Sequence, residues 1–346
     1  MNRQKNGDDR GRQLEEFKRV LENMMDIPYE TSIQKATCAK VAAALSSDEL
    51  DVAASTSYTY WWLTKQKDHG LSDEYMRDAR QQMAMRECKR HCIGEGGDFK
   101  RTLSAVKEAI QYRLQYDIDS VRACTEFAND PTYPPSMTTR LLTTNNNPVS
   151  LNELKAMILD ELANKQAMVV RGYGKEQHAI VYKHPRTVPT KETDEHAFIL
   201  ANLYVAERAV AATEYITKGR KEKLIVIFNF VGYDSANAPP SRLEPIFAKL
   251  MRRAYPERLE RFFFLEPSFW LRLVYNIIYP FLGYETRKKI TFVTNATSAE
   301  KKLATFSDVV DLGQATPHLL EGGELSSPLN MEQYVNNVPF HILYDG

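Results

Sequence analysis

Five short apolar runs, rich in β-branched or aromatic residues, dominate the second half of this 346-residue chain. They are AMVVRGY (167–173), HAIVYK (178–183), KLIVIFNF (223–230), RFFFL (261–265) and ITFV (290–293). Helical patterns separate most of them, notably over about 194–217 and 241–254. Strands that alternate with helices predict an α/β sheet. The run over 223–230 is almost continuously apolar, which predicts a strand covered on both faces.

The first part of the chain is predicted to be helical from Leu14 to about Val121, because apolar residues recur there at helical spacing. One of these helices covers about 99–114, and Asp98 is placed to cap it. Residues 1–13 are charged and lack periodicity, so they are predicted to be disordered. The Pro-rich run over 129–140 is the predicted linker to the sheet domain.

The overall composition narrows the class of protein. Lys and Arg (45) balance Asp and Glu (45), whereas a nucleic-acid binder would show a strong basic excess. The charged start, MNRQKNGDDRGRQ, has no apolar core, so a secretory signal peptide is not expected. Four scattered cysteines are too few for a disulfide framework. We therefore predict a cytoplasmic protein that does not bind nucleic acid.

Catalytic and metal-binding motifs are not evident in the sequence. The run HCIGEGGDFKR (91–101) resembles a phosphatase loop, but Asp98 stands where that chemistry needs an arginine. Cys88, His91 and Cys92 have metal-like spacing and lack a fourth ligand nearby. The sequence contains no G-x-S-x-G, P-loop or H-E-x-x-H motif. A non-enzymatic protein without a metal is therefore expected.

The most apolar stretch of the chain, 261–284, is too interrupted to cross a membrane as one helix. A spanning helix needs roughly 20 apolar residues, whereas Pro267 and Pro280 limit the longest helical piece to 268–279. At about 1.5 Å per residue this piece is about 18 Å long, and the hydrocarbon core is about 30 Å thick. The stretch is instead predicted to contain a buried strand, a turn and a short helix.

The helix predicted over 268–279 is apolar around most of its circumference. Ser268, Arg272 and Asn276 are four positions apart, so they form one narrow polar stripe. A helix of this kind is normally buried, and an interior helix is one interpretation. The other is a helix that covers an apolar ligand cavity or lies at a membrane interface, where Trp and Tyr are favoured.

The segment YPERLERFFFLEPSFWLRLVYNIIYPFLGYETRKKITFV (255–293) resembles the signature of CRAL-TRIO lipid-binding domains, in particular phosphatidylinositol transfer proteins. A looser resemblance extends from about Leu141 to Glu324, and 98–113 is similar to the last helix of the small helical domain that precedes this fold. The resemblance implies a mixed, largely parallel sheet that floors an apolar lipid pocket, with helices around it. The predicted division is a disordered N-terminus (1–13), a helical domain (14–128), a linker (129–140), a CRAL-TRIO domain (141–325) and a tail (326–346).

The resemblance also implies which residues bind the lipid. The headgroup site maps onto Glu257, Arg258, Thr286 and Lys289. The lysine supplies a compact positive charge for a phosphodiester, although each of these residues is also compatible with an ordinary solvated surface role. The gate helix and acyl pocket map onto Phe269, Trp270, Leu273, Val274, Ile277, Ile278 and Phe281. The pocket wall maps onto Leu224, Val226 and Phe228.

Leu224 and Val226 depart from the family pattern, since transfer proteins that also bind phosphatidylcholine carry hydroxyls on this strand. Recognition of a choline headgroup is therefore not expected. The predicted function is to bind one phospholipid, phosphatidylinositol, beneath a mobile gate helix and to exchange it at transiently contacted membranes. No cofactor is expected apart from the bound lipid.

Three alternatives stay open from the sequence. The chain could carry another hydrophobic small molecule, such as a tocopherol-like, retinoid or sterol ligand. It could act as a lipid-gated adaptor that binds a protein partner through residues 1–97. An enzyme of unknown chemistry is the third option.

Overall fold

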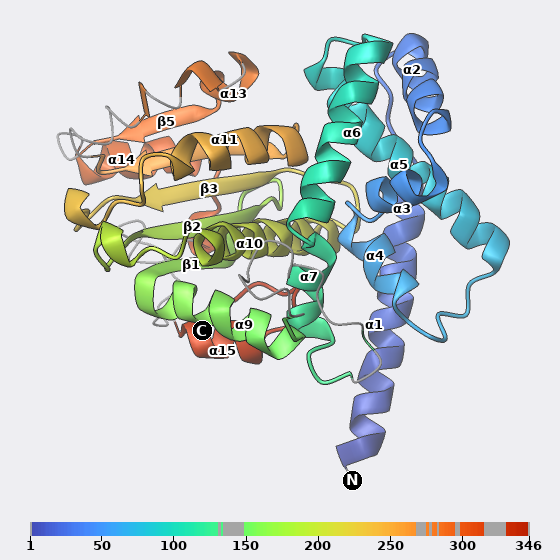
Figure 1. Cartoon of the computed structure of the whole chain (residues 1–346), viewed down its shortest axis with the longest axis horizontal. Coiled ribbons are helices and arrows are strands. Elements are labelled where there is room, and N and C mark those ends of the chain that lie inside the picture. The colour runs from blue at the N-terminus through green and yellow to red at the C-terminus, as the bar shows by residue number, and fades with distance from the viewer. Residues whose placement is uncertain are drawn as a thin grey trace. The chain divides into compact units, whose positions relative to one another are not determined.

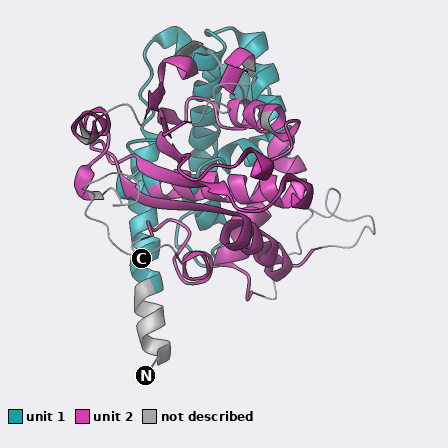
Figure 2. Ribbon diagram, turned by 90° about the vertical axis from the view of Figure 1, so that its left-hand side faces the viewer, with its two compact units in different colours: residues 1–111, 213–222 teal, residues 112–212, 223–346 magenta. Residues whose placement is uncertain are grey.

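The computed structural model of the chain (Figure 1) describes residues 2–130, 133, 149–267, 275–276, 279–281, 284–294, 298–314 and 330–344. Of residues 2–9, 244, 281, 284, 285, 299, 303 and 314 it describes the backbone alone. The chain forms two compact units (Figure 2). Unit 1 contains Met1–Gln111 and Thr213–Glu222, and unit 2 contains the remainder.

Unit 1 is helical, as the sequence predicts. Its helices are α1 (Asn2–Met25), α2 (Ser32–Ala43), α3 (Ser47–Ala54), α4 (Tyr58–Thr64), α5 (Asp73–Gly94) and most of α6 (Phe99–Gln115). Side-chain oxygens of Thr31, Ser46, Ser57 and Ser72 each cap the backbone N–H three residues on. The predicted cap at Asp98 is confirmed, since its Oδ1 accepts a hydrogen bond from the Arg101 N–H at 2.8 Å.

Helix α1 begins at Asn2, so residues 2–13 are helical, whereas the sequence predicts a disordered segment over 1–13. The added residues include good helix formers such as Gln, Lys and Arg, and their charge had indicated disorder. The apolar face of the helix follows the predicted spacing. Phe17, Val20 and Leu21 are fully buried, and the Phe17 ring lies 4.6 Å from that of Trp62 on α4 (centroid to centroid).

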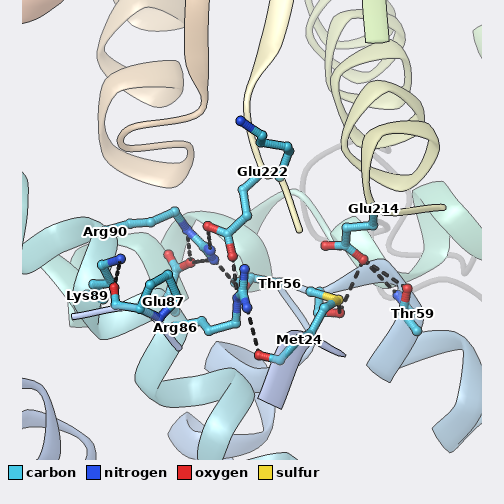
Figure 3. A network of polar contacts seen from close by, with 12 residues as sticks. Met24, Thr56, Thr59, Arg86, Glu87, Lys89, Arg90, Glu214 and Glu222 are labelled. Atoms are coloured by element: carbon cyan, nitrogen blue, oxygen red, sulfur yellow. Dashed lines mark hydrogen bonds and ion pairs between the residues drawn. The ribbon is translucent and has the colours of Figure 1, made fainter. Parts of the chain in front are cut away.

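Unit 1 also includes the distant segment Thr213–Glu222. Figure 3 shows its two carboxylates among side chains of the N-terminal helices. Glu214 Oε2 accepts hydrogen bonds from the Thr59 N–H at 3.0 Å and the Thr59 Oγ1 at 3.1 Å. Gly219 makes the close approach possible, because its φ is 77° and a Cβ there would lie 2.5 Å from Met24 Cγ.

Unit 2 is built on a five-stranded sheet in the order β1-β2-β3-β4-β5. The strands are β1 (Gln166–Tyr173), β2 (Ala179–Arg186), β3 (Leu224–Asn229), β4 (Leu259–Leu265) and β5 (Ile290–Val293). β1 and β2 pair antiparallel, and every later pair is parallel. The predicted fold class, a mixed and largely parallel sheet preceded by helices, is confirmed.

The two faces of this sheet differ in burial. On one face Ile225, Ile227 and Phe263 are at most 1% exposed, and the Phe263 ring lies 4.7 Å from that of Phe306 on α14 (Ala299–Ser307). On the other face, large apolar side chains of β3, β4 and β5 remain partly exposed. β3 is therefore buried on its first face, and on its second face Leu224 is buried while Val226 and Phe228 are partly buried.

The remaining helices of unit 2 surround the sheet. They are α7 (Ile118–Glu126), α9 (Leu151–Asp160), α10 (Glu195–Ile216, whose last turn belongs to unit 1), α11 (Leu243–Ala254), α13 (Tyr284–Lys288), α14 and α15 (Met331–Asn336). Short π- or 3-10 turns are η1 (Glu161–Lys165), η2 (Thr190–Glu192), η3 (Ser235–Asn237), η4 (Tyr279–Phe281) and η5 (Leu312–Gln314). In Figure 1, α10 and α11 lie side by side, and Phe198 and Leu203 of α10 share a buried core with Leu243 and Leu250 of α11.

The described end of the chain is part of this unit and does not form a separate tail. Tyr334, Phe340 and Tyr344 are at most 1% exposed. The Tyr334 hydroxyl accepts a hydrogen bond from the Val170 N–H on β1, and the Val170 carbonyl accepts one from the Tyr344 N–H, both at 3.0 Å. Among the described residues, no helix is long and apolar enough to cross a membrane.

Candidate functional site

The partly exposed sheet face in unit 2 is lined by aromatic rings. Phe264 of β4 lies at its centre, 4.6 Å from Phe262 and 5.0 Å from Phe292 of β5, measured between ring centroids. Phe230 follows β3, is buried, and lies 5.9 Å from Phe264. The in-register partners Phe228–Phe264 and Phe264–Phe292 place these side chains on the same face. Large apolar groups that stay partly exposed in this way favour an apolar ligand or a covering segment. We call Phe228, Phe230, Phe262, Phe264 and Phe292 the aromatic floor.

Tyr275 contacts the aromatic floor from the segment predicted to be the gate helix. Its ring lies edge-on to Phe292 at 5.0 Å and to Phe264 at 6.1 Å between centroids. Residues 275–276 are helical. The sequence interpretation did not include Tyr275 among the gate residues. Six predicted gate residues lie outside the described residues: Phe269, Trp270, Leu273, Val274, Ile277 and Ile278. The seventh, Phe281, is described by its backbone alone, in η4.

The predicted headgroup residues lie at the start of two neighbouring strands. Glu257 and Arg258 directly precede β4, and Thr286 and Lys289 directly precede β5. Because β4 and β5 are parallel neighbours, their amino ends lie at the same edge of the sheet. Lys289 Nζ lies 3.6 Å from Glu257 Oε2, and both side chains are partly exposed.

The backbone at Glu257 has a φ of 56°, which is uncommon for a residue other than glycine, asparagine or aspartate. Such conformations cost about 1–3 kcal/mol and cluster at functional sites. The flanking strand holds it in place, since the Arg258 carbonyl accepts a hydrogen bond from the Leu224 N–H at 2.8 Å. The local strain adds to the reasons for regarding this edge as a binding site.

A second carboxylate contributes to the electrostatics of this edge. Burial by itself would raise the pKa of Glu260, but Lys223, whose Nζ lies 2.8 Å from Glu260 Oε2, lowers it, and Lys289 adds a smaller contribution in the same direction. Lys289 thus lies close to the Glu257 carboxylate and adds weakly to the positive potential at Glu260.

Arg258 and Thr286 are placed differently from this ion pair. Arg258 is 5% exposed, so its side chain is largely withdrawn from solvent. The Thr286 carbonyl accepts a hydrogen bond from the Lys289 N–H at 3.1 Å, which fixes the turn into β5. The Thr286 side chain is partly exposed.

The predicted wall residues Leu224, Val226 and Phe228 alternate along β3, so they share the face of the aromatic floor. Val226 pairs in register with Phe262 of β4, and Phe228 pairs with Phe264. Val226 and Phe228 are partly exposed, whereas Leu224 is buried.

Lys183 of β2 was not singled out from the sequence, yet it lies on the same face. It pairs in register with Phe228, and its Nζ lies 5.0 Å from the Phe228 ring centroid. The Nζ also donates a hydrogen bond to Asn202 Oδ1 on α10 at 3.1 Å. Its one sequence signal was a charged residue on an otherwise apolar face of a strand.

The Cys-His motif of α5 has no metal-site geometry. Cys88, His91 and Cys92 are buried, and His91 Nε2 lies 3.0 Å from Glu87 Oε1. Burial raises the pKa of the Cys88 thiol, which disfavours the thiolate that a metal needs. In the part of the chain that the structure describes, no group of three or more His, Cys, Asp or Glu could hold a metal ion.

Comparison with known proteins agrees with this architecture. The sequence profile of the CRAL/TRIO domain matches residues 163–314, a range that contains all five strands. A sequence search of the curated proteins finds no match. Among solved structures, "Crystal structure of Sfh5" superposes on this chain with a TM-score of 0.56 and 14% sequence identity. The match covers 90% of this chain and 94% of that chain, and it shows a similar fold. Residues 163–314 of the chain therefore match the CRAL/TRIO domain in sequence, and the chain shares its fold with the solved structure.

Proposed function

We propose that the protein binds one phospholipid, phosphatidylinositol, and exchanges it at membranes without catalysing a reaction. The observation that carries this proposal is the aromatic floor: an apolar sheet face, partly exposed, with the Glu257–Lys289 ion pair at its edge. In this arrangement the acyl chains lie on the floor near Tyr275, and the polar headgroup lies at the amino ends of β4 and β5.

The energetics of extraction favour a large apolar surface. Moving a CH₂ group from the bilayer into water costs about 0.8 kcal/mol of free energy, unless the protein buries that group again. Phe262, Phe264 and Phe292 supply such a surface, and the contact of the Tyr275 ring with Phe292 supports a cover over it.

The chemistry of the edge suits an inositol phospholipid. Lys289 offers an ammonium to the phosphodiester, and Thr286 can add its hydroxyl. Glu257 accepts hydrogen bonds from the inositol hydroxyls while it stays close to Lys289, 3.6 Å away.

Replacing Lys289 by Ala is expected to lower phosphatidylinositol loading about 10- to 100-fold, because a hydrogen bond to a charged group contributes about 1.5–3 kcal/mol. The measurement is the amount of phosphatidylinositol taken up from labelled vesicles by purified protein. Lys288→Ala, an exposed neighbour on α13, is the matched control. Equal loading of Lys289→Ala, Lys288→Ala and wild type would show that this edge is not the headgroup site.

A basic and apolar surface on α11 supports transient membrane contact. Ile246 is 44% exposed, and Lys249 and Arg252 follow it at intervals of three residues, which places them along one side of the helix. η4 lies beside α11, and its Tyr279 is 41% exposed, with the Arg287 guanidinium 4.0 Å from the ring centroid. Aromatic, aliphatic and basic groups together suit the interface of an anionic bilayer.

The double substitution Lys249→Glu with Arg252→Glu is expected to lower binding to vesicles containing phosphatidylserine by at least about tenfold, since each basic residue near such a surface contributes about 1 kcal/mol. Vesicle co-sedimentation measures this, with Lys301→Glu on α14 as an exposed control. Unchanged binding of the double variant would exclude α11 from the membrane contact.

A carrier of another hydrophobic small molecule is the second candidate function. Val226 and Leu224 present no hydroxyl to a ligand on this face, which suits a ligand with little polar surface. Mass spectrometry of the lipids that co-purify with the protein separates the two candidates. A sterol, retinoid or tocopherol-like ligand in place of phosphatidylinositol would favour the second.

A further inference from the structure

Lys183 places a positive charge on the face that carries the aromatic floor. Its position is set by strand pairing, since Val181 pairs with Val226 and Lys183 pairs with Phe228 across β2 and β3. Its Nζ lies 5.0 Å from the Phe228 ring centroid and 5.3 Å from that of Phe198 on α10. Two aromatic rings at this distance attract an ammonium and hold it at the apolar surface.

Asn202 fixes the direction of this ammonium. It is 6% exposed, and its Nδ2 donates a hydrogen bond to the Phe198 carbonyl at 2.7 Å. Because the amide nitrogen is engaged on its own helix, the amide oxygen is turned toward Lys183, from which it accepts a hydrogen bond at 3.1 Å. The amide oxygen of Asn202 and the two rings thus contribute to the orientation of the ammonium, whose positive charge can attract an anionic oxygen.

Lys183 lies far from the headgroup edge. It is in register with Phe228 near the end of β3, whereas Glu257 and Lys289 lie at the amino ends of the strands, beside Leu224. Four residues of strand correspond to about 13 Å at about 3.3 Å per residue. The aromatic floor thus has a polar group at each end.

We infer that Lys183 and Asn202 form a second polar subsite that binds the acidic group of an amphiphile, a carboxylate or a phosphate monoester, whose apolar part lies on the aromatic floor. This inference rests on the proposed lipid function. The ammonium repels the quaternary ammonium of choline, and it attracts an oxygen anion through a charge-assisted hydrogen bond. The subsite therefore selects a ligand distinct in charge from phosphatidylcholine.

The experiment measures displacement of a fluorescent fatty acid from the delipidated full chain by three competitors: oleic acid, dioleoyl phosphatidate and the neutral oleyl alcohol. Wild type is expected to prefer at least one of the two acids over the alcohol by about tenfold or more, as one charge-assisted hydrogen bond allows. The acid that is preferred identifies the carboxylate or the phosphate as the bound group. Lys183→Met is expected to lose this preference while its affinity for oleyl alcohol stays within about twofold of wild type.

Two further variants keep the test decisive. Lys183→Arg retains the charge and is expected to retain the preference, and the exposed Lys175→Met is the matched control. The inference is overturned if wild type shows no acid preference, or if Lys183→Met keeps it, while phosphatidylinositol loading still depends on Lys289. If wild type takes up none of these amphiphiles and no phosphatidylinositol, both the inference and the proposed function are overturned.

Discussion

Replacing Glu207 by Gln is expected to lower the free energy of unfolding of unit 2 by about 3–5 kcal/mol, the usual effect of breaking a buried ion pair from one side. Glu207 on α10 is 1% exposed and accepts hydrogen bonds from three side chains. Arg113 Nη1 lies 3.0 Å from its Oε1, Arg122 Nε 2.6 Å from its Oε2, and the Tyr255 hydroxyl 2.5 Å from its Oε1. A neutral glutamine at this position would leave two buried guanidinium groups without their shared carboxylate.

Urea unfolding measures this loss, with Glu332→Gln on α15 as the control, since that carboxylate is exposed. Because the chain contains two compact units, the transition of unit 2 is followed by amide exchange of residues 195–212 in α10 and of residues in α11. A loss below about 1 kcal/mol, the level of a surface ion pair, would contradict the prediction.

The pH dependence supplies an independent test of the same network. Burial by itself would raise the pKa of Glu207, but Arg113 and Arg122 outweigh it and lower the pKa from 4.5 to about 2. A lowered pKa in the folded state stabilises the fold fully above the unfolded value of 4.5, and this contribution is lost as the pH falls toward about 2. The difference in stability between wild type and Glu207→Gln should therefore shrink over that window.

The sheet could be predicted because each strand carries its own signal. β-branched and aromatic runs located all five strands, and β5 begins and ends at the predicted residues. The family resemblance grouped Glu257 with Lys289, and the structure brings them together because residues that precede neighbouring parallel strands meet at one edge. These features depend on local sequence and on one rule of topology.

The features that could not be predicted depend on tertiary contacts between distant residues. Glu207 and Arg113 read as ordinary polar positions of helices, and only packing shows that both are buried. Asn202 helps to orient the Lys183 ammonium, yet nothing in the sequence indicates that this residue of α10 contacts one of β2. Tyr344 looked like part of a tail because its partner Val170 lies on a distant strand. Whether a polar side chain is buried depends on its tertiary partners, and the periodicity of the sequence does not predict which residues those partners are.

Replacing Glu222 by Gln is expected to loosen the segment Thr213–Glu222 and to lower the stability of unit 1 by about 2–3 kcal/mol, the scale of hydrogen bonds to charged groups. Figure 3 shows the Glu222 carboxylate between Arg86 and Arg90 of α5. Arg90 Nη1 lies 2.8 Å from Glu222 Oε2, and Arg86 Nε donates to Oε1. The two arginine side chains are 8% and 6% exposed, so water replaces the lost charge poorly.

The effect of Glu222→Gln should be local, because the substitution acts on one of two carboxylates that fasten the segment. Glu214 keeps its hydrogen bonds to Thr59 at the start of this segment, whereas the end of the segment loses its ion pairs. Amide exchange near residue 222 should therefore accelerate by at least about tenfold, with a smaller change near residue 214. Glu30→Gln, an exposed position of unit 1, is the control. If exchange instead accelerates equally throughout unit 1, then Arg86 and Arg90 need Glu222 to keep the whole helical unit folded, and its role is not confined to fastening this segment.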